Sequence, residues 1–213
     1  CDFGHTAPRA RPAHSPKTSG IMLNNKDKPA SSPWPAIFSL TVACFVMVTT
    51  EFLPIGLLTN IAPSLGVSTG TAGLMVTMPG IVAAVAAPVL SLASGRLDRR
   101  LLMLGLSLLL MVSNLVAALA VNFPMMLLGR VLLGICVGGF WSFAANYGRH
   151  LVPEASQGRA TALILSGISV GAVCGVPAGA LIGDLFGWRA AFFGGAALAV
   201  GVLLAQQIGR AHV

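Results

Sequence analysis

Six long apolar runs are the feature of this sequence that most limits its fold. Each run has about the 20 residues that an α-helix needs to cross the roughly 30 Å hydrocarbon core of a bilayer. The runs are far longer than the ~10 alternating residues of a membrane β-barrel strand, so they predict helices. They cover Ala36–Leu58, Thr71–Ser94, Leu101–Val121, Met125–Tyr147, Thr161–Ile182 and Ala190–Ile208. The sequence therefore predicts an all-α membrane protein with six transmembrane helices in contact with membrane lipid.

The composition excludes the two common alternatives. Of the 213 residues, 55% are hydrophobic and 9% are charged, whereas soluble domains carry roughly 25% charged residues. So few charges cannot cover a water-exposed surface, and so apolar a chain is not typical of disorder. The four cysteines show no metal-ligand spacing, so we expect no metal site.

Positive charges are distributed unevenly along the chain. A net charge of +7 would suit nucleic-acid binding, but lysine and arginine concentrate in short loops and tails. Eleven of the 13 fall on one side of the predicted membrane, in residues 1–35, 95–100 and 148–160 and at Arg210, against Arg189 on the other side. We therefore expect no nucleic-acid partner. We expect a multi-pass protein of the bacterial inner membrane, with both termini in the cytoplasm.

The two ends of the chain differ from the predicted six-helix domain at 36–207. Residues 1–35 are rich in proline, serine and basic residues and predict a disordered cytoplasmic tail, with Met22 as a candidate native start. Residues 208–213 read like a translated sequencing-adapter DNA, so we expect a non-native tail there.

Local sequence signals mark three of the predicted helix starts, two of them by a capping residue. Ser68 precedes the second span, and Asn122 precedes the fourth, which has Pro124 in its first turn. Asp98 lies where the third span begins, and an acidic residue suits the positive end of the helix dipole.

Two charged residues fall inside predicted spans. An ionised side chain at a span centre costs roughly 2.5–3.5 kcal/mol on the translocon scale, and such residues usually serve a pathway. At about 1.5 Å per residue, Glu51 and Arg130 both lie ~10 Å below the outer membrane edge. Equal depth permits a proton and solute relay, which we favour, or an ion pair that merely orients two helices.

Trp141 extends the predicted pathway along the fourth span. It lies eleven residues after Arg130, about three helical turns, so both share one face. We expect Gly134 and Gly138 to leave room between them, so that a small polar or aromatic solute could be held there. The alternative is that Trp141 faces lipid.

Five glycines repeat at every fourth position of the fifth span. We call this set, Gly167, Gly171, Gly175, Gly179 and Gly183, the glycine ladder. Small residues at this spacing let a neighbouring helix approach closely, and Pro177 inside the ladder can bend the helix. The ladder is either tight packing alone or also a seam that moves during a cycle.

Five segments together resemble the N-terminal half of a major facilitator superfamily transporter. Residues 51–56 resemble the first-helix motif of its drug, sugar and purine-nucleoside efflux members, and residues 129–134 resemble the fourth-helix motif whose arginine is implicated in proton coupling. The gating loop of the family is matched by Gly95, Asp98, Arg99 and Arg100. The ladder with Pro177 resembles the antiporter motif, and residues 187–192 resemble the start of helix six.

The resemblance implies a twelve-helix protein in two halves, each made of two inverted three-helix repeats. This chain would be one half, lacking a C-terminal six-helix partner and unable to transport alone. The implied function is export of a small solute (sugar, nucleoside or drug-like) in exchange for protons, with the proton gradient as energy source and no cofactor. Glu51 would be the acid that is protonated from outside, with Arg130 as its partner.

Three alternatives stay open at the level of sequence. A proton-coupled importer of the same family would share these motifs, and a six-helix channel would need a filter or charge ring, which is not apparent. Ser169 lies in a Gly-x-Ser-x-Gly pattern like that of an intramembrane serine protease. That chemistry needs a base beside the serine, and all four histidines lie outside the predicted spans. We therefore expect that the protein is not an enzyme.

Overall fold

The computed structural model describes residues 34–93, 99–150 and 156–208, and within these ranges the chain forms helices joined by short turns, without a strand. In this described part of the chain, six helices are long and apolar enough to cross a membrane, as predicted. The elements are α1 (Trp34–Phe52), η1 (Leu53–Leu57), α2 (Leu58–Ser64), α3 (Thr69–Ala72), α4 (Leu74–Ala93), α5 (Arg99–Ala118), α6 (Phe123–His150), α7 (Gln157–Phe186) and α8 (Trp188–Ile208).

The first span is built from three consecutive segments. Pro54 lies at the start of the short 3-10 helix η1, where the α-helical pattern of α1 ends. The apolar path then continues through α2 to Ser64, further than the predicted end at Leu58. The extension is stabilised by burial, because Ile61 and Ala62 are enclosed in the apolar core.

Side-chain caps start two spans as predicted. The Ser68 hydroxyl accepts the Thr71 backbone N–H at 3.1 Å and caps α3, which leads into α4 through Gly73. The side-chain Oδ1 of Asn122 accepts the Met125 backbone N–H at 2.9 Å at the start of α6. Both capping predictions are confirmed. Asp98, the acidic residue predicted at the start of the third span, lies outside the described residues.

The fifth span is longer than predicted at both ends. α7 begins at Gln157, before the predicted Thr161, and ends at Phe186, after the predicted Ile182. Gly187 ends it with a φ of 83°, in the left-handed region that favours glycine. Its N–H bonds the Gly183 carbonyl at 3.0 Å, and α8 begins at the next residue.

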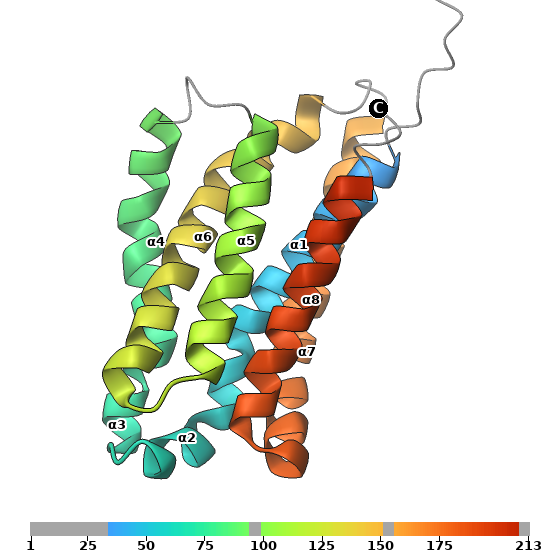
Figure 1. Cartoon of the computed structure of the whole chain (residues 1–213). Coiled ribbons are helices and arrows are strands. Elements are labelled where there is room, and N and C mark those ends of the chain that lie inside the picture. The colour runs from blue at the N-terminus through green and yellow to red at the C-terminus, as the bar shows by residue number, and fades with distance from the viewer. Residues whose placement is uncertain (1–33, 94–98, 151–155, 209–213) are drawn as a thin grey trace, which may run out of the picture. The chain divides into compact units, whose positions relative to one another are not determined.

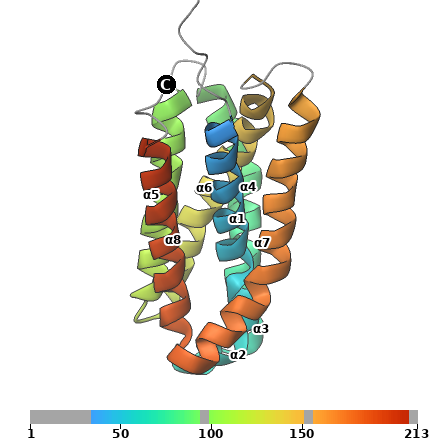
Figure 2. The same ribbon diagram turned by 90° about the vertical axis from the view of Figure 1, so that its right-hand side faces the viewer.

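Four helix pairs make extensive contacts: α1 with α7, α4 with α6, α5 with α8, and α5 with α6. Exchanging α1 with α6, α4 with α7 and α5 with α8 leaves the first three pairs unchanged as a set. The same exchange turns α5–α6 into α1–α8, a pair that is also in contact, though less extensively. α1 runs toward the end of the bundle that carries α2 and α3, whereas α6 runs away from it (Figure 1). The second view shows the same alternation of helix directions (Figure 2). The bundle is therefore two inverted three-helix repeats, in agreement with the predicted fold class.

Candidate functional site

Arg130 on α6 lies inside the bundle, with 1% of its surface exposed. Its Nη1 donates to the backbone carbonyl of Thr50 on α1 at 3.3 Å. Its guanidinium carbon lies 4.7 Å from the ring centroid of Phe192 on α8, which is within cation–π range. One cation thus contacts α1 and α8, helices that belong to different repeats.

Proline chemistry explains why the Thr50 carbonyl can accept this bond. In an α-helix the carbonyl of residue 50 would accept the N–H of residue 54, but residue 54 is a proline and has no N–H. The α-helical hydrogen-bond pattern ends at this place, where η1 begins. Pro54 therefore removes the usual partner of the carbonyl that receives Arg130.

Arg130 has fewer partners than a buried guanidinium can use. Its Nε has no hydrogen-bond partner, and among the described residues the buried Thr49 hydroxyl is the other side-chain group in this condition. A guanidinium carries five N–H donors, and burying a cation with few partners is unfavourable. A residue that served only to orient helices would be expected to satisfy more of its donors.

Glu51 follows Thr50 in the chain and is half-buried. The Arg130 bond to Thr50 therefore places both charges at nearly the same depth, and they attract one another. The Arg130 hydrogen bond nevertheless goes to the Thr50 carbonyl and not to the Glu51 carboxylate. Glu51 is an electrostatic neighbour of Arg130 that leaves its carboxylate free for other chemistry.

Trp141 does not share the enclosed environment of Arg130. Its side chain is 44% exposed. The expectation that Gly134 and Gly138 leave room between the two residues is wrong, because α4 fills it. A methyl group at Gly134 would lie 2.7 Å from the Pro79 carbonyl oxygen, and one at Gly138 would lie 2.8 Å from that of Ala83.

The glycine ladder lies against α1 and η1 along its whole length. Methyl groups at Gly167, Gly171 and Gly179 would lie 2.6, 2.8 and 2.6 Å from the carbonyl oxygens of Thr41, Phe45 and Leu53. Gly175 approaches the Thr49 carbonyl in the same way, and Gly183 contacts the Leu57 side chain. The partners also repeat every fourth residue, so two parallel helices meet backbone to backbone. Pro177 lies within α7 and is exposed.

The remaining predicted residues lie elsewhere or outside the described ranges. Gly95 and Asp98 of the gating loop are not among the described residues, whereas Arg99 and Arg100 form the first turn of α5. The Ser169 hydroxyl donates to the Leu165 carbonyl of its own helix at 3.0 Å.

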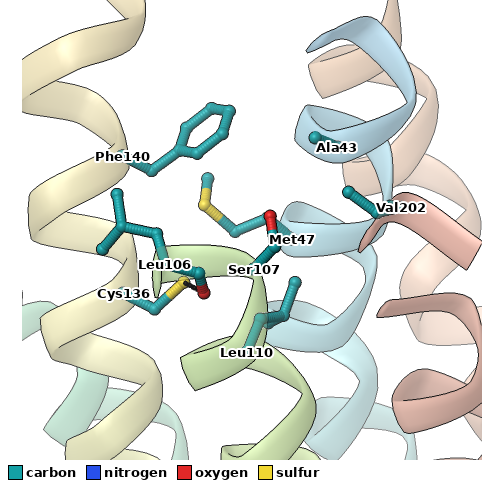
Figure 3. Close-up of a pocket in the computed structure, with 8 residues that line it drawn as sticks. All are labelled: Ala43, Met47, Leu106, Ser107, Leu110, Cys136, Phe140 and Val202. Atoms are coloured by element: carbon teal, nitrogen blue, oxygen red, sulfur yellow. Dashed lines mark hydrogen bonds between the residues drawn. The ribbon is translucent and has the colours of Figure 1, made fainter. Parts of the chain in front are cut away.

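A small cavity of about 10 Å³ lies between α1, α5, α6 and α8 (Figure 3). Its lining is mostly apolar, with Ser107 and Cys136 as its polar side chains. Ser107 donates to the Gln206 side chain at 3.1 Å, and Cys136 donates to the Leu106 carbonyl at 3.2 Å. This volume suits about one water molecule, so the cavity is far too small for a nucleoside or sugar.

Two contacts of Arg130 and two of Arg189 were not predicted from the sequence. The Thr50 carbonyl had an indirect signal in Pro54, four residues later, because a proline always leaves that carbonyl without its helical N–H. Phe192 had no signal, because an apolar residue in an apolar span does not reveal its neighbour. Arg189, at the start of α8, bonds the carbonyl of Ala120 in the turn after α5 at 3.0 Å and stacks on Trp188 at 4.2 Å.

Inverted repeats that enclose a buried cation beside a carboxylate define a class: multi-pass membrane proteins of the secondary-transporter type. The comparison with protein families identifies the member of that class. The Major Facilitator Superfamily model matches residues 40–207, and the chain belongs to this family. Because the family is one of transporters, the prediction that the chain is not an enzyme is confirmed.

Individual relatives match most of this chain. The chain is 39% identical over 175 residues to the transcription regulatory protein OpdE of Pseudomonas aeruginosa. The matched region covers 82% of this chain and 44% of that protein. It is 39% identical over 172 residues to the purine ribonucleoside efflux pump NepI of Escherichia coli, covering 80% of this chain and 42% of the pump. The pump of the same name from Shigella dysenteriae is 38% identical, with 80% and 43% covered. The chain thus spans less than half the length of these relatives.

Proposed function

We propose that the protein is a proton-coupled exporter that moves a small solute out of the cytoplasm by alternating access. The observation that carries this proposal is Arg130, a buried and incompletely bonded cation beside a half-buried carboxylate in the interior of a transmembrane bundle. Intramembrane charges in such a position usually serve ion or solute pathways. The efflux-pump relatives support the outward direction.

Glu51 is the proton carrier in this mechanism. A proton that arrives from outside neutralises its carboxylate and removes the attraction to Arg130. A neutral carboxyl is also less costly to enclose in a medium of low polarity. Protonation therefore changes the relative free energies of the inward-open and outward-open forms, and this difference couples the proton to the solute.

The other predicted residues take supporting roles in the proposal. Trp141, with its exposed ring, offers a stacking surface for a planar solute. Gly95, Asp98, Arg99 and Arg100 act in the gating loop. The exported solute is a nucleoside, sugar or drug-like molecule, and the NepI relatives favour a purine ribonucleoside. A second six-helix half completes the solute cavity, in a bacterial inner membrane with both chain termini in the cytoplasm.

The test is exchange in proteoliposomes. The full-length protein that carries this chain is reconstituted, loaded with radiolabelled inosine, and exposed to an imposed pH gradient, and the 213-residue chain is measured in parallel. We expect gradient-driven inosine movement opposite to the protons with the full-length protein, and none with the 213-residue chain.

Glu51→Gln is the decisive variant, and Asp184→Asn is its matched control. Both replace a carboxylate by an amide, and these are the two acidic residues in the described part of the chain. Asp184 is exposed and accepts a hydrogen bond from Asn60 at 3.2 Å. We expect Glu51→Gln to lose dependence on the gradient and Asp184→Asn to keep it. Gradient-driven exchange by Glu51→Gln at the wild-type rate would remove Glu51 from the coupling, and inosine moving in the direction of the protons would indicate an importer.

A further inference from the structure

We propose that Phe192 is a positioning residue that holds the guanidinium of Arg130 at the Thr50 carbonyl. This inference rests on the proposed function for its consequence in transport, although the contact itself can be tested without transport. Phe192 is fully buried, and its ring faces the guanidinium at 4.7 Å. Trp188, one turn earlier on α8, meets Phe192 edge to face at 6.0 Å and an interplanar angle of 79°.

The ring and the carbonyl restrict Arg130 from two different helices. The Thr50 carbonyl on α1 supplies one directional hydrogen bond, and Pro54 keeps that oxygen free of a helical N–H. The electron-rich face of Phe192 on α8 attracts the cation in a water-poor interior, where cation–π attraction is strongest. Neither contact neutralises the guanidinium, so Arg130 remains a full positive charge beside Glu51. A carboxylate in place of the ring would hold the cation as firmly but would cancel that charge.

The competing explanation is that Phe192 only fills space. Its burial alone would make Phe192→Leu ambiguous, because lost packing and lost attraction would both lower activity. A fluorinated ring separates the two, because 3,4,5-trifluorophenylalanine keeps the shape of phenylalanine and weakens the negative face of the ring. Phe193 is the matched control, since it is the next residue on α8 and is 44% exposed.

The first measurement is the ¹H–¹⁵N spectrum of arginine side chains in the 213-residue chain. Arg130→Lys identifies the Nε–H signal of Arg130 by removing it. A proton held over the face of an aromatic ring resonates upfield, so we expect an upfield Arg130 signal that moves downfield in Phe192→Leu and stays in Phe193→Leu. An Arg130 signal that is the same in all three proteins would overturn the contact, whatever the transport assay shows.

The second measurement is inosine exchange by the full-length protein with trifluorophenylalanine at position 192 or 193. We expect the maximal rate to fall about tenfold at 192 with the KM for inosine unchanged, and no change at 193. Equal rates for the two fluorinated proteins would overturn the positioning role. If the unmodified protein moves no inosine, the proposed function fails, and the spectrum still decides whether Phe192 holds Arg130.

Pro54→Ala tests the other side of the same arrangement. Alanine restores an N–H at residue 54, which competes with Arg130 for the Thr50 carbonyl. We expect this variant to move the Arg130 Nε–H signal, whereas Pro63→Ala, at an exposed position in α2, leaves it unchanged. An Arg130 Nε–H signal that stays at its wild-type position in both proline variants would contradict the assignment of the Thr50 carbonyl as the second contact.

Discussion

Replacing a ladder glycine by alanine is expected to weaken the contact between α1 and α7. At Gly179 the new methyl group would lie 2.6 Å from the Leu53 carbonyl oxygen and needs about 0.8 Å of separation to reach an ordinary contact of 3.4 Å. The obstacle is backbone, which cannot rotate away as a side chain can. Overpacking of this kind costs about 1–3 kcal/mol.

Gly201 on α8 is the matched control for this change. A methyl group there would meet nothing within 4 Å, so alanine brings only its better helix propensity, about 1 kcal/mol. The same propensity gain applies at Gly179 and cancels in the comparison. Gly179→Ala should therefore unfold with a free energy about 1–3 kcal/mol below that of Gly201→Ala.

The assay is equilibrium unfolding of the 213-residue chain in mixed micelles, followed by tryptophan fluorescence, with the buried Trp188 as a reporter. The ladder itself supplies a graded series. The nearest carbonyl is 2.6 Å from a methyl group at Gly179, 2.8 Å at Gly171 and 3.0 Å at Gly175, so alanine should destabilise in that order. Stabilities equal to that of Gly201→Ala at all three positions would refute close backbone packing as the role of the ladder.

Three further predictions concern the ends of the helices. Arg189→Ala should lower the unfolding free energy by about 1–2 kcal/mol, because it removes a hydrogen bond to the turn after α5 and the stacking on Trp188. Calorimetry of the wild-type protein and the variant measures this difference. Ser68→Ala should cost about 1 kcal/mol through the lost cap, and Thr77→Ala, at an exposed position in α4, should cost less in the same micelle titration. A cysteine at Asn122 in a cysteine-free chain should react with an impermeant maleimide added outside intact cells, and labelling only after lysis would reverse the proposed topology.

The sequence was sufficient to predict the six spans and two of the residues that cap them. Length and apolar composition identify a membrane helix without tertiary information, and capping by Ser68 and Asn122 is a local contact within one turn. The ends of the first and fifth spans were harder to predict. α2 remains helical because the folded bundle buries Ile61, and this burial exists only after folding.

Orientation within the bundle was the part that the sequence could not supply. Gly134 and Gly138 share a helix face with Arg130, but a helix face is wide enough to contact two different neighbours. Arg130 points toward α1 and α8, whereas the two glycines contact α4. Depth along a helix follows from counting residues, so the level of Glu51 and Arg130 was predictable. The residue that Arg130 contacts across the bundle depends on how the helices rotate and pack against each other, and the sequence of one span does not contain that information.

The helix pairs indicate how this bundle can move. The four most extensive contacts, α1–α7, α4–α6, α5–α8 and α5–α6, each join a helix of one repeat to a helix of the other. The α1–α7 and α4–α6 contacts also bring glycines against backbone carbonyls, and such close packing resists sliding. The repeats are therefore interlocked, and tight packing is the better interpretation of the glycine ladder than a moving seam. A change of charge at Glu51 would act on the whole bundle as one body, because Arg130 connects α6 to both α1 and α8 at the same level.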